Sequence, residues 1–217
     1  MPWSVIIPVC LINDELTAMF IECLESLNRR KNKFELIVVE NGSDLVEADR
    51  RTKVIKFPKP IGYARAVNAG LKKAMGDRIL IINSDATLVT PNWQGELDKV
   101  FDMCFNTGLV IPDLKNAGET AFTSQLVGPC WAVSKSMVNV LGFLPEVYAE
   151  GYYEDTEYYL RAKQDGWLIK SCRDVRVLHK GQSTFKALYN SEKIRSLSEK
   201  NHGLYLERNN SQFPEFT

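Results

Sequence analysis

The pattern of apolar and polar residues predicts strands that alternate with helices over the first ninety residues. Short, nearly uninterrupted apolar runs occupy residues 5–9, 34–40 and 79–82, and a shorter one occupies residues 54–57. Such runs are typical of strands that are buried on both faces of a parallel sheet. Between them, apolar residues recur at helical spacing after Asn13 and again after Gly62. The order β-α-β-β-α-β predicts an α/β fold with a mainly parallel sheet flanked by helices.

Polar residues collect where these apolar runs end. Glu40 and Asn41 follow the second run, and Asn83, Ser84 and Asp85 follow the central run at residues 79–82. In open α/β sheets the ligand crevice lies beyond the carboxyl ends of the strands. The pattern therefore predicts a nucleotide-type crevice there, with Asp85 placed to hold a metal. The alternative is a turn or a helix cap, since the same residue types favour such positions.

The second half of the chain is less regular, and its clearest feature is a cluster of acids. Glu154, Asp155 and Glu157 lie in or just before the first turn of a helix whose body is predicted at residues 158–164. The structural alternative to a catalytic cluster is a solvated helix cap, which we expect to describe Glu157.

Two short strands, at residues 168–172 and 175–179, are expected after this helix, and the second ends at His179. A helical tail is expected from Phe185 onward. We expect one domain over residues 1–184 and a C-terminal helical tail over residues 185–217.

Composition and charge limit the function classes. The chain has 217 residues, of which 45% are hydrophobic and 25% charged, as is ordinary for a soluble globular protein. Its 27 Lys and Arg balance 27 Asp and Glu, so no overall field attracts nucleic acid or an anionic membrane. Five scattered cysteines without a CxxC pair argue against a disulfide framework or structural zinc site, and favour a cytoplasmic location. We expect neither a cleaved signal nor an integral membrane segment.

Six segments resemble the family-2 inverting glycosyltransferases, which have a Rossmann-like GT-A fold. They read SVIIPV, IVVENGSD, IGYARAVNAG, NSD, GYYEDTEYYLRAKQDG and VLHKGQS, and they span about residues 4–183 in the family's order. The resemblance is closest to small bacterial rhamnosyltransferase-like members. It implies a nucleotide-sugar-binding half over residues 1–90 and an acceptor-binding half over residues 91–184.

The resemblance implies a UDP- or dTDP-sugar donor and a divalent cation, Mn²⁺ or Mg²⁺, that neutralises its diphosphate. Asp85 matches the last acid of the family's DxD motif, whereas Asn83 replaces the first acid and leaves one carboxylate. His179 matches a histidine that can complete the metal or diphosphate site. A His and Asp pair favours manganese over calcium. The alternative for a lone His is a hydrogen-bonded structural residue.

The resemblance also implies the remaining donor contacts. Glu40 or Asn41 would accept a hydrogen bond from the base, Gly62 would permit close backbone approach, and Arg65 would offset phosphate charge. The alternatives are a strand-end turn and a helix N-terminus with one buried face. The full set of implied donor-binding residues is Pro8, Val9, Glu40, Asn41, Gly62, Arg65, Asn68, Asn83, Ser84 and Asp85.

For the acceptor, the resemblance implies an inverting displacement with a general base. Asp155 matches the second residue of the family's ED motif, where that base is expected, and Glu154 is expected to raise its proton affinity. Trp131, Tyr152 and Tyr153 are candidates for a sugar-stacking platform, although such aromatics also build cores.

The leading hypothesis is a metal-assisted inverting glycosyltransferase that moves a sugar to a hydroxyl on a saccharide or other acceptor. A second hypothesis is a catalytically silent nucleotide-sugar-binding or scaffold module, suggested by the missing first acid of the DxD motif. A third is a nucleotidyltransferase, which the lack of a Gly-rich, basic phosphate loop after the first strand disfavours. The tail is open to acceptor docking, homodimerisation or peripheral membrane contact.

Overall fold

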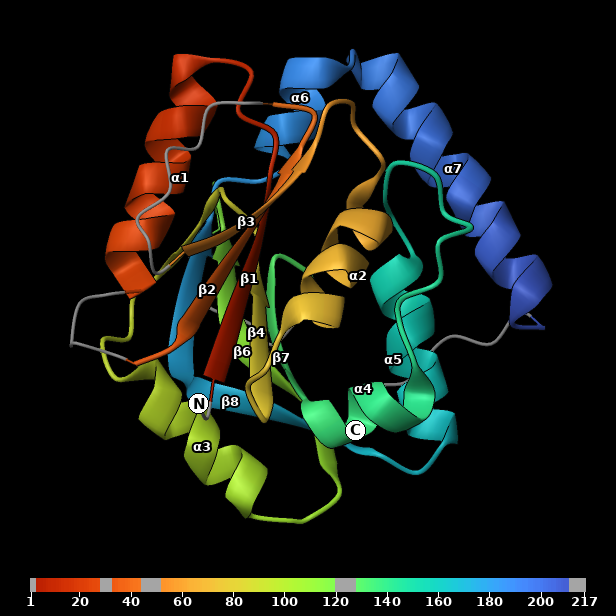
Figure 1. The fold of residues 1–217 in the computed structure, drawn as a ribbon. Helices are drawn as coiled ribbons and strands as arrows, with labels where there is room; N and C mark the ends of the chain where they lie inside the picture. The colour runs from red at the N-terminus through yellow and green to blue at the C-terminus, as the bar shows by residue number, and fades with distance from the viewer. Residues whose placement is uncertain (1–2, 28–32, 44–51, 120–127, 211–217) are drawn as a thin grey trace.

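The computed structural model describes residues 3–27, 33–43, 52–119 and 128–210, and it contains one mixed sheet flanked by helices (Figure 1). Eight strands lie in the order β3-β2-β1-β4-β7-β6-β8-β5. The first four of these pair in parallel: β3 (Thr52–Phe57), β2 (Glu35–Asn41), β1 (Trp3–Val9) and β4 (Arg78–Ile82). The predicted α/β class with a mainly parallel sheet is confirmed.

The other half of the sheet is mixed. Its strands are β7 (Cys130–Ser134), β6 (Thr107–Asn116), β8 (Leu168–His179) and β5 (Ala86–Leu88). The two short strands predicted at residues 168–172 and 175–179 are wrong, because β8 is a single strand. Its pairing with β6 shifts between Pro112 and Asp113, whose partners are Cys172 and Arg176. This irregularity explains why the apolar pattern breaks there.

Helices cover both faces of the sheet (Figure 1). α1 (Asp14–Leu27) and α3 (Trp93–Asp102) cover one face, and α2 (Tyr63–Lys73), α4 (Lys135–Leu141) and α5 (Glu154–Gln164) cover the other. α6 (Ser183–Leu188) and α7 (Ser191–Arg208) form the helical tail. No helix in the described part of the chain combines the length and apolar character that a bilayer crossing requires.

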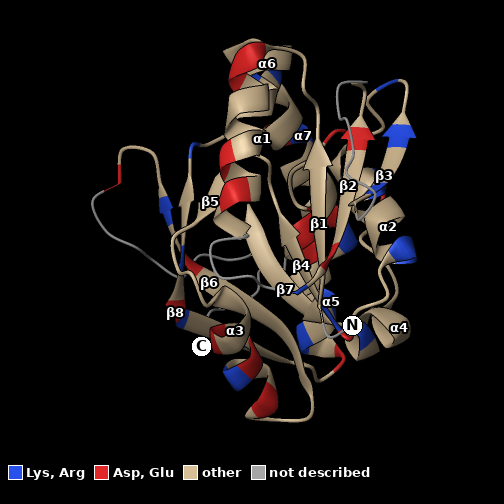
Figure 2. Cartoon of the chain, turned by 60° about the vertical axis from the view of Figure 1, so that its left-hand side comes forward, with Lys and Arg blue, Asp and Glu red and all other residues tan. Residues whose placement is uncertain are grey.

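Charged residues are spread over strands and helices (Figure 2). At the ends of β2 and β3, an acidic position lies beside a basic one, and Glu40 pairs in register with Lys56. The Glu40 carboxylate is fully buried and lies 3.4 Å from Lys56 Nζ. This contact fixes Glu40 at the sheet edge.

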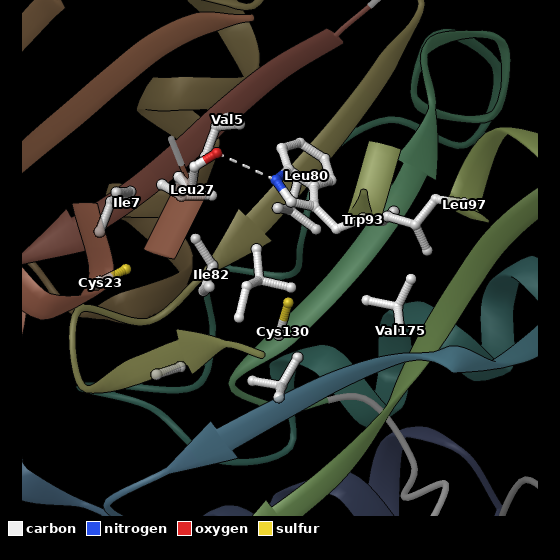
Figure 3. Close-up of a cluster of buried hydrophobic side chains, with 14 of the residues drawn as sticks. Val5, Ile7, Cys23, Leu27, Leu80, Ile82, Trp93, Leu97, Cys130 and Val175 are labelled. Carbon is white, nitrogen blue, oxygen red and sulfur yellow. Dashed lines mark hydrogen bonds between the residues drawn. The ribbon is translucent and has the colours of Figure 1, made fainter. Parts of the chain in front are cut away.

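The central strand β4 contributes to two cores, which explains its unbroken apolar run. Leu80 and Ile82 pack toward α1 and α3, where the Trp93 indole nitrogen donates to the Leu27 carbonyl (Figure 3). Ile79 and Ile81 pack on the opposite face, under α2, α4 and α5. All four side chains are fully buried. Alternate residues of a strand point to opposite faces. When both faces are buried, every side chain of the strand lies in a core and is apolar.

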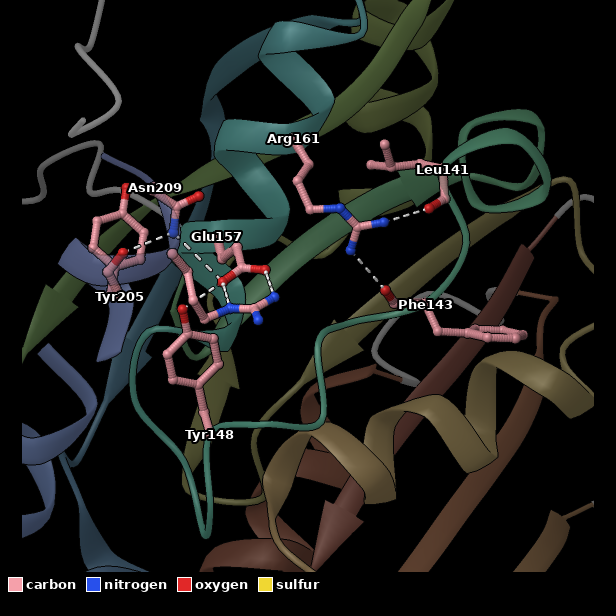
Figure 4. Close-up of polar contacts among 8 residues, drawn as sticks. Leu141, Phe143, Tyr148, Glu157, Arg161, Tyr205 and Asn209 are labelled. Carbon is pink, nitrogen blue, oxygen red and sulfur yellow. Dashed lines mark hydrogen bonds and ion pairs between the residues drawn. The ribbon is translucent and has the colours of Figure 1, made fainter. Parts of the chain in front are cut away.

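The tail helix α7 is tied to α5 through Glu157, and the expectation that Glu157 is a solvated cap is wrong. Glu157 is 3% exposed and accepts hydrogen bonds from Arg208 Nε and Nη2 at 2.9 and 2.8 Å. The Tyr148 hydroxyl and the Asn209 amide also donate to it (Figure 4). The acid points inward because its partners come from a helix fifty residues further along the chain.

Candidate functional site

The carboxyl ends of three parallel strands open into one cavity of about 660 Å³. β1 lies between β2 and β4 and is parallel to both, so the residues that follow each strand meet at the same edge. Helix α5 begins at the same cavity, and β8 ends there. The strand-end residues that line it are Pro8, Val9, Asn41, Asn83, Ser84 and Asp85.

Asp85 and His179 form a pair on the cavity wall. The Asp85 Oδ1 atom lies 3.3 Å from His179 Nε2, and Oδ2 accepts a hydrogen bond from the Ser183 backbone at 3.2 Å. Asp85 is 7% exposed. Burial alone would raise the pKa of the Asp85 carboxyl, but the bonds and charge of His179 and the bond from Ser183 outweigh it and lower that pKa. Asp85 is therefore held as a carboxylate.

A third residue, Asn116, orients the histidine ring. His179 Nδ1 lies 3.0 Å from Asn116 Oδ1, and the Asn116 amide nitrogen donates to Glu119 Oε1. Because this second bond fixes the amide, Asn116 Oδ1 faces the ring as an acceptor and Nδ1 carries the hydrogen. The neutral ring with its hydrogen on Nδ1 has its lone pair on Nε2, which is the form that binds a metal, whereas the bond from Nε2 to Asp85 needs a hydrogen on Nε2. Sequence reasoning missed Asn116, which belongs to none of the six segments and lies at the end of β6 only in the structure.

The described lining is rich in acids and contains no Lys or Arg. Its titratable groups include Asp85, Glu150, Glu154, Asp155 and His179. A diphosphate in such a cavity would be repelled unless a cation lay between it and the carboxylates. The cavity thus favours a bound cation.

Asp85 and His179 fit a divalent cation as two of its ligands. Adjacent ligands at bond lengths of about 2.1 Å lie about 3 Å apart in octahedral geometry, close to the observed 3.3 Å. The Asn83 Oδ1 atom on the same wall is buried and has no hydrogen-bond partner among the described residues. No group of three or more His, Cys, Asp and Glu side chains suited to a metal occurs in the described ranges.

Glu154 and Asp155 lie at the start of α5 on the same cavity. Glu154 is 4% exposed, and its Oε2 atom has no hydrogen-bond partner in the described structure. Asp155 Oδ1 accepts from the Thr156 backbone at 2.7 Å and from its hydroxyl at 3.2 Å. Two hydrogen-bond donors therefore stabilise the ionised form of Asp155, whereas one carboxylate oxygen of Glu154 has no donor.

Burial raises the pKa of both carboxyls, and the charge of Asp155 further raises the pKa of Glu154 well above its ordinary value. Repulsion between two carboxylates is reciprocal, so the expectation that Glu154 raises the proton affinity of Asp155 stays a prediction.

The segment before α5 has an unusual backbone. Glu150, Tyr152 and Tyr153 have φ values of 66°, 70° and 74°, in the left-handed region that disfavours side chains other than glycine. Gly62 has φ 89°, and a Cβ there would lie 3.2 Å from the Glu150 nitrogen. Tyr63 donates its backbone hydrogen to the Glu150 carbonyl at 3.1 Å. The close approach that Gly62 permits is therefore to this loop.

Helix α7 holds the same loop from the other side. Asn201 is 1% exposed, and its Nδ2 donates to the Ala149 carbonyl at 3.2 Å and to the Gly151 carbonyl at 2.6 Å. The Tyr153 ring stacks on His202 with centroids 5.3 Å apart and planes at 17°. The tail thus helps to determine where α5 begins and where Asp155 lies.

We expect Asn201→Leu to lower the free energy of unfolding by about 1–3 kcal/mol, because two buried carbonyls lose their donor while the volume is nearly kept. Urea unfolding measures the loss, and amide exchange of residues 150–153 should accelerate. Lys200→Leu, at an exposed neighbouring position, is the control and should change stability by less than about 0.5 kcal/mol. Equal stability of the two variants would show that α7 does not hold the loop.

Four of the implied site residues do not line the cavity. Asn68 is 1% exposed and bonds to the Leu144 backbone and to Glu146, and Arg65 lies 3.5 Å from Glu146. Trp131 is fully buried beside Tyr158, so its face is not available for sugar stacking. Glu40 is held by Lys56, as described above. These side chains satisfy contacts within the fold, and sequence pattern alone does not distinguish such contacts from ligand contacts.

The cavity brings together the other implied residues. Asn41 Oδ1 also accepts from the Ile61 backbone at 2.7 Å, which joins the end of β2 to the loop before α2. The implied residues that line the cavity are Pro8, Val9, Asn41, Gly62, Asn83, Ser84, Asp85, Tyr152, Tyr153, Glu154, Asp155 and His179. Their functional roles stay predictions.

Comparison with known proteins gives a family match over the first half of the chain. Residues 4–102 match the model of glycosyl transferase family 2. An uncharacterized glycosyltransferase of Haemophilus influenzae is 30% identical over 108 residues, which cover 44% of this chain and 40% of that protein. The chain spans less than half the length of the curated relatives that it matches.

Solved structures share the fold at low identity. Staphylococcus aureus TarS 1–349 in complex with UDP-GlcNAc has a TM-score of 0.67 at 17% identity, and the match covers 88% of this chain and 62% of TarS 1–349. GalNAc-T7 with UDP, GalNAc and Mn²⁺ has a TM-score of 0.67 at 14% identity, covering 83% and 44%. The predicted GT-A fold is confirmed, whereas the rhamnosyltransferase-like subtype stays a prediction.

Proposed function

We propose that the chain is a glycosyl transferase of family 2 that transfers a sugar from a UDP- or dTDP-sugar to a hydroxyl acceptor with inversion at the anomeric carbon. The observation that carries this proposal is the composition of one cavity. It joins the Asp85 and His179 pair, the strand-end residues and Asp155 in a space of about 660 Å³. The residues proposed to bind the leaving diphosphate and the proposed general base thus line the same cavity.

Asp85 and His179 would hold a divalent cation, Mn²⁺ or Mg²⁺, with the Asn83 amide oxygen beside them. When bound, the cation would neutralise the diphosphate charge as the sugar leaves. The acidic lining supports this assignment, and so does the Mn²⁺ in the GalNAc-T7 structure. Asn116 orients the His179 ring for it.

Asp155 would act as the general base. Its carboxylate takes the proton of the acceptor hydroxyl while the acceptor oxygen forms a bond to the anomeric carbon. On the opposite side of the sugar, the bond to the diphosphate breaks, and the diphosphate keeps the electron pair. Burial and the charge of Asp155 raise the pKa of Glu154, which disfavours a second negative charge beside the base.

The other contacts follow from positions on the cavity wall. Pro8, Val9 and Asn41 would contact the nucleotide base, and Tyr152 and Tyr153 would face the acceptor. The UDP-GlcNAc complex of TarS supports the choice of donor class. Five unpaired cysteines, four of them buried, support a location in the reducing cytoplasm.

The test is a panel of UDP-, dTDP- and GDP-sugars, each assayed with Mn²⁺ and with a chelator. At about 100-fold excess over its Kd, a matching donor should stabilise the protein by about 2.7 kcal/mol, which raises Tm by several degrees. We expect transfer or slow donor hydrolysis with Mn²⁺. We expect Asp85→Ala to lose the activity that Mn²⁺ stimulates in wild type. Binding without turnover would instead identify a silent nucleotide-sugar module, and binding of no member would refute the donor assignment.

A further inference from the structure

A second pocket of about 290 Å³ lies between α6, α7 and the loop before α5. Ser191, Ile194, Arg195 and Ser198 line it from α7 at the spacing of a single helix face. Lys186 lines it from α6. Buried Leu197, Asn201 and Tyr205 occupy another face of α7, so the pocket-lining face is separate from the buried one.

The charge of this pocket is opposite to that of the main cavity. Lys186 and Arg195 are its titratable lining residues, apart from Tyr152, and both are basic. Lys186 Nζ donates to the Gly181 carbonyl at 2.9 Å, which places its ammonium group over the loop that follows β8. The Arg195 Nε atom lies 3.8 Å from Glu199, in an ion pair that is more than 70% exposed on both sides and therefore weak. Both cations retain donors for a ligand.

The two pockets are adjacent and share three lining residues. Tyr152, Gln182 and Ser198 line both of them. Tyr152 lies three residues before Asp155, and its ring packs on Phe185 at 5.0 Å. A saccharide that reaches from the basic pocket into the main cavity therefore passes Tyr152 before it meets Asp155.

We propose that the pocket formed by Lys186, Arg195, Ser191 and Ser198 is an acceptor subsite for an anionic group, a phosphate or a carboxylate, on the saccharide whose hydroxyl faces Asp155. The proposal rests on the proposed transferase function. Charge supplies its physical basis, because the main cavity repels anions and this side pocket attracts them. The hydroxyls of Ser191 and Ser198 add uncharged donors. Its volume is near the lower end of ordinary ligand pockets.

The experiment uses matched acceptors: a hexose, the same hexose 6-phosphate and the corresponding hexuronate. Transfer to each is measured with wild type, with Lys186→Ala/Arg195→Ala, and with Lys193→Ala, which removes a cation from α7 outside the pocket. We expect the double variant to raise KM for an anionic acceptor about tenfold, with little change for the neutral hexose or the donor. Preference for phosphate over hexuronate, or the reverse, identifies the anion.

Calorimetric titration of hexose 6-phosphate into the protein with UDP and Mn²⁺ provides a readout that does not need turnover. Weaker binding to the double variant but not to Lys193→Ala would support the subsite even if no sugar were transferred, so failure of the transferase proposal stays distinguishable. Equal binding by all three proteins would overturn the subsite. A rise in donor KM instead of acceptor KM would also overturn it, since the cations would then serve the diphosphate.

Discussion

Asp155→Asn should lower kcat for sugar transfer by about 10²–10⁴-fold, which is the usual contribution of a general base. The amide keeps the shape of the side chain and can still accept from Thr156, but it cannot take a proton. Nucleotide binding should persist, because Asp85 and His179 are unchanged. The measurement is transfer of a radiolabelled sugar, together with the thermal shift produced by UDP and Mn²⁺.

Asp165→Asn is the matched control, because Asp165 follows the C-terminal end of the same helix and bonds to Trp167 rather than lining the cavity. Its kcat should stay within about twofold of wild type. If Asp155→Asn retained full activity, the proton would have another acceptor and the proposed mechanism would be wrong.

The pH profile provides a further check on the same residue. Burial raises the pKa of Asp155, so the acid limb of kcat/KM should lie above the range of an ordinary aspartate. Activity should be full above that pKa and fall as the pH drops through it, because the protonated base cannot act.

Arg208→Leu should lower the free energy of unfolding by about 2–3 kcal/mol at neutral pH. The change leaves Glu157 buried with only Tyr148 and Asn209 as partners, and removal of one partner from a buried ion pair usually costs about 3–5 kcal/mol. We expect the lower figure because the Arg208 side chain is 39% exposed. Urea unfolding monitored by circular dichroism measures the difference.

The stability difference should depend on pH in one direction. Burial would raise the pKa of Glu157, but Arg208 and Tyr148 outweigh it and lower that pKa. The contribution of the pair is therefore fully present above the unfolded value and is lost as pH falls through the lower folded value. The stability difference between wild type and Arg208→Leu should therefore shrink as the pH falls below the range of an ordinary glutamate.

Arg195→Leu is the control on the same helix, because its ion pair with Glu199 is exposed and 3.8 Å long. It should change stability by less than about 0.5 kcal/mol. Equal losses in the two variants would mean that the Glu157 contact does not anchor the tail.

The sequence by itself determined the α/β class and the strands that form the cavity edge. Ile79 to Ile82 could be assigned because a strand buried on both faces must be apolar at every position. Asp85 could be placed at a crevice because residues that follow parallel strands share an edge. The start of α5 was likewise predictable from its acids and helical spacing. These features depend on the local pattern of apolar and polar residues, which can be read from the amino-acid sequence.

Only the tertiary structure decided which polar residues face the cavity. Asn68 was implied as a donor contact and Glu157 was expected to be solvated, yet their partners come from the loop that contains Leu144 and from α7. Asn116 and Asn201 carry no sequence signal, although one orients His179 and the other holds the loop before Asp155. The reason is physical: the direction of a polar side chain depends on partners fifty or more residues away, whereas hydrophobic periodicity depends on neighbours.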